Sequence, residues 1–315
     1  MVVLAALLAA VTVTFPPAGT KMPALDQCYM SGAVERGVTN LTVQGKPVEI
    51  YKTGGWVTML DLQEGLNMIE IVAGSEKTNH CFTAGQKPLP VKTGESFAQV
   101  AEKKYEKIPY AKDAARPHPT GKQPSEIKIV LDAGHGGKDP GTRSPHGFCE
   151  KEANLRVVRE IAKALEEKGY QVVLTRSDDT FIDLFDRPKA AHTNDADAFV
   201  SIHHNAPGFS TDPRTVRYHT VYYWNPLGQR LATAINLQMA TVLDGDIPSR
   251  GTLHANYAVT RNPEIPSCLV EVDFMTTPQA EEAVFDHIRR RAIARAIAQG
   301  IADWCALSPS VPSAP

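Results

Sequence analysis

Four polar side chains lie beside or within apolar segments of the chain. The first is a histidine between glycines. His135 belongs to Val130–Gly141, which reads V-L-D-A-G-H-G-G-K-D-P-G and overlaps the apolar run Ile127–Leu131. This run has the pattern of a strand that is buried on both faces. A histidine at its carboxyl end lies where α/β sheets bind ligands, and the glycines let the backbone turn sharply beside it. A Gly-rich turn that carries a histidine by chance is the alternative interpretation.

Three further groups follow at places that an α/β fold brings to the same edge of a sheet. Glu150 precedes a run with helical spacing of apolar residues, so it lies near a helix amino terminus, where it could simply complement the helix dipole. His203 ends the apolar run Ala198–Ile202, and a single histidine after a strand is usually structural. Glu271 lies within the apolar strand Cys268–Phe274. An acid in such a strand must be paired, protonated or bound to a cation.

Two histidines and one carboxylate are the protein ligands of a catalytic zinc site that keeps one coordination position open. A second carboxylate near that position would take a proton from the attacking water. We expect His135, Glu150 and His203 to bind zinc. Glu271 is then the base, because a carboxylate in a buried strand is better desolvated than one at a helix start. The sequence alone also allows the two glutamates to exchange roles.

The motifs together resemble those of the zinc-dependent N-acetylmuramoyl-L-alanine amidases, which split the stem peptides of peptidoglycan from the glycan strands. The resemblance covers about residues 127 to 304 and implies that His135, Glu150 and His203 bind zinc and that Glu271 is catalytic. His204 departs from the family pattern, because family members often have a small residue at this position. Its side chain could contact the ligand residues outside the metal site, or it could change the pocket wall. The matching segments are Val130–Gly141, Glu150-Lys151, Ser201-Ile202-His203 and Leu269–Phe274, with residues 173–179, Arg187 and residues 261–267 also similar.

The resemblance implies cleavage of the amide between N-acetylmuramic acid and L-alanine by zinc-activated water. A zinc peptidase or deacetylase that acts on another cell-wall amide would use the same metal chemistry. A catalytically silent wall-binding protein would retain only the scaffold. We expect a monomer whose partner is peptidoglycan. A formal net charge of −2 and the lack of a basic motif argue against nucleic acid as a partner.

The amino-terminal residues 1–25 are predicted to be a signal-like segment. Val2–Phe15 is apolar and rich in alanine, which is typical of the hydrophobic part of a secretory signal, although no basic residue precedes it. A buried helix is the alternative. The run is short for a membrane span. We therefore expect an exported protein of the periplasm or cell envelope, with no membrane span in the mature chain.

Residues 26–85 and 86–126 differ in composition. The first region has short apolar runs between glycine turns, which predicts a small all-β domain of sandwich type. The second is a Pro- and Lys-rich connector, in which residues 91–105 faintly resemble half of a LysM glycan-binding repeat. Among five cysteines, Cys28 and Cys81 could form a disulfide in an exported protein. The predicted strands of the β domain are Thr39–Val43, Val48–Tyr51, Trp56–Leu60 and Met68–Val72.

Residues 127–307 alternate strands and helices, which predicts an α/β domain with a mixed twisted sheet covered by helices, followed by a flexible tail over residues 308–315. Some amidases of the family have an inhibitory helix between the strand of the second histidine and the next strand. Here only Asn205–Thr215 separates them, and two prolines interrupt it, so we expect no such helix. The predicted elements are strands at 171–175, 198–203, 216–224 and 268–274, and helices near 151–165, 227–243 and 279–304.

Overall fold

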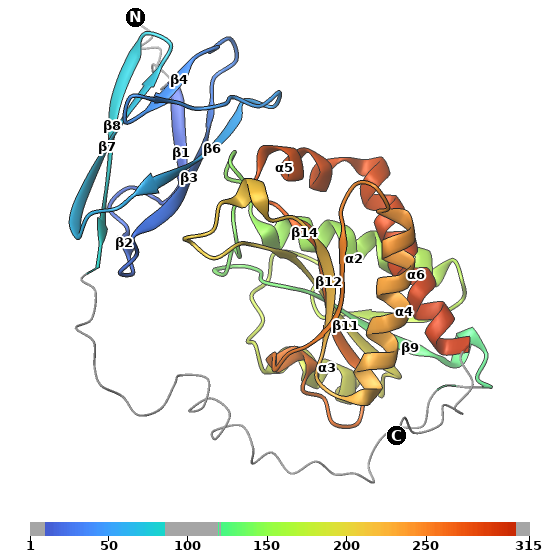
Figure 1. Ribbon diagram of the computed structural model, residues 1–315. Coiled ribbons are helices and arrows are strands. Elements are labelled where there is room, and N and C mark those ends of the chain that lie inside the picture. The colour runs from blue at the N-terminus through green and yellow to red at the C-terminus, as the bar shows by residue number, and fades with distance from the viewer. Residues whose placement is uncertain (1–9, 86–118, 120, 307–315) are drawn as a thin grey trace, which may run out of the picture.

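The protein consists of an N-terminal β domain packed against a C-terminal α/β domain (Figure 1). The computed structural model describes residues 10–85, 119 and 121–306. The LysM-like segment, most of the connector and the tail lie outside the described residues. Among the described helices, none is both long enough and apolar enough to cross a membrane.

The α/β domain is built on a six-stranded mixed sheet, as the sequence predicted. The strand order is β10-β9-β11-β14-β12-β13, in which β10, β9, β11 and β14 are parallel and β12 runs antiparallel to β14. The strands are β9 (Lys128–Ala133), β10 (Gln171–Leu174), β11 (Ala198–Asn205), β12 (His219–Tyr223), β13 (Ser249–His254) and β14 (Ser267–Phe274).

Helices cover both faces of this sheet. One face packs on α2 (Glu150–Glu166), α4 (Pro226–Val242) and α6 (His287–Ala306), which form the main core with alternate residues of β9, β11 and β14. The other face packs on the short α3 (Asp186–Thr193) and η3 (Ala258–Thr260). Because alternate strand residues share a face, Phe199 of β11 and Leu269 of β14 pack against this smaller layer. A further helix, α5 (Pro278–Phe285), follows β14 and is capped by Thr277.

The β domain is a sandwich of two sheets, in agreement with the predicted class. Its sheets have the orders β1-β3-β6 and β2-β8-β7-β4-β5. Met30, Trp56, Ile71 and Phe82 are fully buried between them. The strands are β1 (Val11–Phe15), β2 (Lys21–Met22), β3 (Gln27–Val34), β4 (Leu41–Val43), β5 (Lys46–Pro47), β6 (Gly55–Asp61), β7 (Gly65–Ala73) and β8 (Glu76–Ala84).

The predicted boundary of the signal-like segment at residue 25 is wrong. Residues 11–15 form β1, which pairs antiparallel with β3, and Ala10, Val11 and Met22 belong to the buried core. The buried-helix alternative is wrong for the same residues. The run Val-Thr-Val-Thr-Phe alternates with the period of a strand and is rich in β-branched residues, which favours a sheet. Residues 1–9 lie outside the described part of the chain.

The proposed disulfide between Cys28 and Cys81 is also wrong. Both thiols are free, and they lie on strands of different sheets, β3 and β8. Burial raises the pKa of the Cys28 thiol to about 11, so it behaves as an apolar core residue. Residues 48–51 do not form the predicted strand and contribute only an isolated bridge from Ile50 to Trp56.

Candidate metal centre

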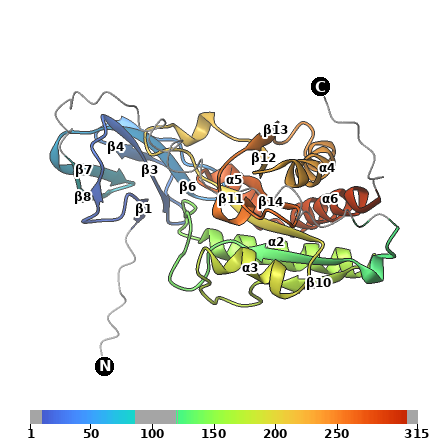
Figure 2. The same cartoon turned by 90° about the horizontal axis from the view of Figure 1, so that it is seen from below.

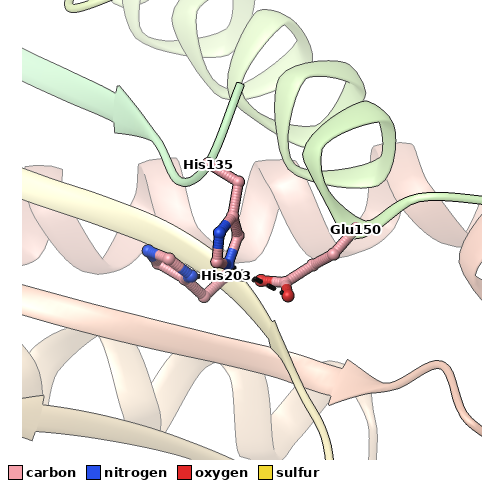
Figure 3. A group of neighbouring side chains, drawn as sticks. All are labelled: His135, Glu150 and His203. Atoms are coloured by element: carbon pink, nitrogen blue, oxygen red, sulfur yellow. Dashed lines mark hydrogen bonds and ion pairs between the residues drawn. The ribbon is translucent and has the colours of Figure 1, made fainter. Parts of the chain in front are cut away.

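His135, Glu150 and His203 converge where β9, α2 and β11 meet, and their side chains point toward one another (Figure 3). His135 Nε2 lies 3.1 Å from Glu150 Oε2, and His203 Nδ1 lies 3.0 Å from Glu150 Oε1. One ligand atom from each residue lies within 4.8 Å of the others. Two imidazole nitrogens and a carboxylate at this spacing fit the ligand set of zinc. The arrangement places together the three residues that the sequence predicted as ligands.

Two glycines make this close approach sterically possible. A Cβ atom at Gly134 would lie 2.2 Å from the ring of His203, and one at Gly141 would lie 2.5 Å from Glu150 Oε2. His135 itself has a φ of 62°, in the left-handed region that non-glycine residues rarely adopt. Such backbone strain persists only where surrounding contacts enforce it. The Gly-rich motif around His135 is therefore a packing requirement of the site.

A second set of contacts orients these three side chains. Asp139 Oδ2 lies 2.8 Å from His135 Nδ1, which leaves Nε2 directed at the other two ligands. Asn154 Nδ2 and the backbone N–H of His204 each donate to Glu150 Oε1 at 3.1 Å. Carboxylates and amides behind metal ligands fix their orientation and tautomer. The roles of Asp139 and Asn154 were not predicted from the sequence, although Asp139 lies within the same Gly-rich motif.

The electrostatics of the cluster favour a cation at its centre. Although burial opposes the charge, hydrogen bonds from His135 and His203 hold the pKa of Glu150 well below its usual value. Burial likewise opposes a charge on His135, but hydrogen bonds and attraction from Glu150 and Asp139 raise its pKa to about 9. In this buried cluster a proton on His135 therefore balances the charge of Glu150, and a bound cation would supply the same balance.

Glu271 lies beside this cluster on the same face of the sheet. It is the register partner of His203 in the parallel pair of β11 and β14. Its Oε2 atom is buried and has no hydrogen-bond partner among the described residues. Burial raises the pKa of Glu271 to about 7, with a contribution from Glu150 that His203 and His135 oppose. A carboxylate of this kind can both accept and return a proton near neutral pH.

The ring of His204 points to the opposite face of the sheet from His203. Its Nδ1 lies 2.8 Å from Asn154 Oδ1, and only 3% of the residue is exposed. Burial lowers the pKa of His204 to about 4, so the ring is neutral. The side chain of His204, which departs from the family pattern, therefore positions Asn154, which in turn contacts Glu150. His204 does not line the pocket wall.

Three further polar residues, His219, His254 and Arg250, lie apart from the cluster of His135, Glu150 and His203. His219 is fully buried, and its ring nitrogens have no partner among the described residues. His254 is exposed and stacks on Trp224 at 4.9 Å. Arg250 lies over the ring of Tyr218 at 4.7 Å. The structure joins none of these three to the metal ligands by a contact.

Two buried arginines hold the turn that carries His135. Arg187 Nη1 donates to Asp132 Oδ1 and to the Ala133 carbonyl, both at 2.9 Å, and Nη2 donates to the His135 carbonyl at 2.8 Å. Arg176 donates to the carbonyls of Ala133 and Gly134 at 2.8 Å and 2.9 Å. The planar guanidinium groups thus fix consecutive carbonyl oxygens, which explains how the strained backbone at His135 persists.

We therefore expect Arg187→Lys to weaken zinc binding about tenfold, within the range for loss of a partner behind a metal ligand. Lysine retains a charge beside Asp132, so the fold should survive, but one ammonium group cannot span the carbonyls that Arg187 joins. Competition with a chelator measures the affinity. Arg159→Lys is the matched control, because Arg159 is exposed and donates to the Ser177 carbonyl. Equal zinc affinities of the two variants would contradict this role of Arg187.

Residues 129–303 match the family model described as N-acetylmuramoyl-L-alanine amidase, which is more than half of the chain. The chain belongs to this family. The resemblance inferred from the motifs is thereby confirmed, as is the fold class. The family match does not extend to the β domain.

Relatives and solved structures agree with this assignment. The chain is 33% identical over 180 residues to the "Probable cell wall amidase LytH" of Staphylococcus epidermidis, a match that covers 56% of this chain and 57% of that protein. It thus spans little more than half the length of this relative. The N-acetylmuramoyl-L-alanine amidase AmiC2 of Nostoc punctiforme is 36% identical with a TM-score of 0.53, covering 57% of this chain and 97% of that one. The catalytic domain of the amidase CwlV from Bacillus (Paenibacillus) polymyxa is 32% identical with a TM-score of 0.53, covering 56% and 97%.

Proposed function

We propose that this protein hydrolyses the amide between N-acetylmuramic acid and L-alanine of the peptidoglycan stem peptide, and that zinc is its cofactor. The observation that carries the proposal is the cluster of His135, Glu150 and His203, with Glu271 beside it whose Oε2 has no hydrogen-bond partner among the described residues, in a chain of the amidase family. The relatives are named cell wall amidases, which supports action in the cell envelope by an exported protein.

In this proposal His135, His203 and Glu150 would hold the metal, each through one ligand atom. A bound zinc ion supplies a Lewis acid that polarises the amide carbonyl and lowers the pKa of water to about 7. Glu271 takes the proton of the attacking water through its unpartnered Oε2, since its pKa lies near that of the donor. Glu271 then returns the proton to the nitrogen of L-alanine as the carbon–nitrogen bond breaks. Asp139 keeps His135 in one tautomer throughout.

Metal removal gives the first test. Treatment with a chelator should abolish release of stem peptides from purified peptidoglycan, because it removes the Lewis acid that polarises the carbonyl in this proposal. Addition of one equivalent of zinc should restore it, whereas magnesium should not, since it prefers an all-oxygen site. Full activity in a protein shown by elemental analysis to be free of transition metal would contradict the proposal. A zinc peptidase or deacetylase would pass this test and is separated by its products.

A further inference from the structure

Three segments of the α/β domain that contact the β domain lie near residues of the candidate site in the chain. The two domains lie side by side in both views (Figures 1 and 2). One segment, residues 142–149, directly precedes Glu150. A second, residues 206–212, begins three positions after His203. The third is the start of α5, which follows the strand of Glu271. The β domain therefore meets the α/β domain at the edge of the sheet where the site lies.

An aromatic stack forms the contact with the segment that follows His203. The ring of Phe15 lies between those of Tyr29, at 4.5 Å and 25°, and Phe209, at 5.5 Å and 23°. The backbone N–H of Tyr29 donates to the Phe209 carbonyl at 3.0 Å. One loop of the α/β domain is thus held by both a side chain and a backbone contact from strands β1 and β3.

The other two segments pack as closely against the β domain. Thr14 Oγ1 donates to the Pro145 carbonyl at 2.5 Å. A Cβ atom at Gly55 would lie 3.0 Å from Pro278 and 3.3 Å from Pro145, so only glycine fits there without displacement of a neighbour. Lys52 and Glu282 add an exposed ion pair at 4.0 Å, which contributes little. These contacts show that the two domains share a packed boundary.

The segment 206–212 needs such support because it has little structure of its own. It lies between the end of β11 and the 3-10 turn at Pro213–Thr215, and, as the prolines of 205–215 predicted, this stretch contains no helix longer than that turn. Within these described residues, one backbone hydrogen bond forms, from the Thr211 N–H to the Gly208 carbonyl at 2.9 Å. Without an external anchor, the cost of ordering this segment would fall on substrate binding.

We propose that the β domain is a working part of the substrate site, and that Phe209 is the positioning residue through which it acts. The stack of Phe15, Tyr29 and Phe209 keeps residues 206–212 in place beside His203, so that a peptidoglycan strand meets a preformed wall. This inference rests on the proposed amidase function. The β domain would then help to recognise the polymer. The family assignment, which covers residues 129–303, says nothing about such a role.

The test compares full-length Phe209→Ala with Leu237→Ala, a control on the exposed side of α4. Phe209→Ala should raise KM for soluble glycan chains with stem peptides about 2- to 10-fold, which corresponds to the loss of one aromatic pair. Zinc content and kcat should stay unchanged. Hydrogen exchange at the Tyr29 amide should be faster in Phe209→Ala, and the control should match the wild type in every measurement.

Two results would overturn the inference. Faster exchange with an unchanged KM would mean that the contact serves only to join the domains. A higher kcat/KM would mean that the β domain obstructs the site. A wild-type protein without amidase activity would instead refute the proposed function, and the substrate role of the contact with it, while the exchange rates would still report whether the segment is held.

Discussion

Glu271→Gln is expected to lower kcat by about 10²–10⁴-fold, the usual effect of losing a general base. Glutamine has the shape of glutamate but cannot accept the proton of the attacking water. Zinc should remain at one equivalent, because His135, Glu150 and His203 are untouched. Steady-state kinetics on a muropeptide substrate, with zinc content measured on the same sample, checks both halves of this expectation.

The matched control is Glu264→Gln, which changes an acid on the loop before the same strand. The carboxylate of Glu264 is partly exposed and lies 3.9 Å from the ring of His192, a long contact, so its loss should leave kcat unchanged. Glu150→Gln should behave differently from both, with weakened zinc retention, because Glu150 contacts both histidine rings. Zinc loss in Glu271→Gln together with zinc retention in Glu150→Gln would exchange the roles of the two glutamates.

His203→Ala is expected to lose zinc and activity together. Removal of one of three protein ligands should weaken the affinity by more than the roughly 100-fold upper range for a partner behind a ligand. It also leaves Glu150 buried without one of the two rings that stabilise its charge. His135→Ala should act in the same way. Elemental analysis after gel filtration measures the bound zinc.

His254→Ala provides the comparison for this variant. It removes an imidazole that is exposed and stacked on Trp224, away from any contact with the ligands, and it should retain zinc and full activity. Stoichiometric zinc in His203→Ala or in His135→Ala would refute the assignment of the ligands.

Much of the site was predictable from the sequence because its parts follow strong local patterns. His135 and His203 each end an apolar run, and parallel strands bring such ends to one edge of a sheet. Glu150 begins an amphipathic helix, α2, whose apolar face was plain from its spacing. The sequence left the roles of the two glutamates open. The geometry favours Glu150 as the ligand, since it lies between both rings, and Glu271 as the base, since its Oε2 is unpartnered.

The residues that support the ligands were not predictable, because their partners are set by tertiary contacts. Asn154 lies on a helix face that could have packed anywhere, and only the fold shows that it meets Glu150 and His204. Arg187 was noted as similar to the family, but its carbonyl partners depend on how α3 lies under β9. A side chain that satisfies backbone groups leaves no periodic trace in the sequence.

Several elements were missed because the local pattern was weak or misleading. Strand β13 reads Ser-Arg-Gly-Thr-Leu-His and is stabilised by pairing at the edge of the sheet with β12, not by apolar content. Helix α3 is short and contributes the buried Ala191 and the partly buried Ala190 to an apolar core. Strand β1 follows an alanine-rich run, and that context resembled a signal more than a strand. In each case the deciding contacts are remote in the chain.

The most direct test of the central claim is the identity of the bond that opens. Purified peptidoglycan treated with the zinc-loaded protein and resolved by mass spectrometry should release intact stem peptides with a free amino group on L-alanine. The glycan strands should retain N-acetylmuramic acid with a free lactyl carboxyl group. Stem peptides cut at an internal peptide bond, or glycan strands that lose acetyl groups while the peptides stay attached, would contradict the account.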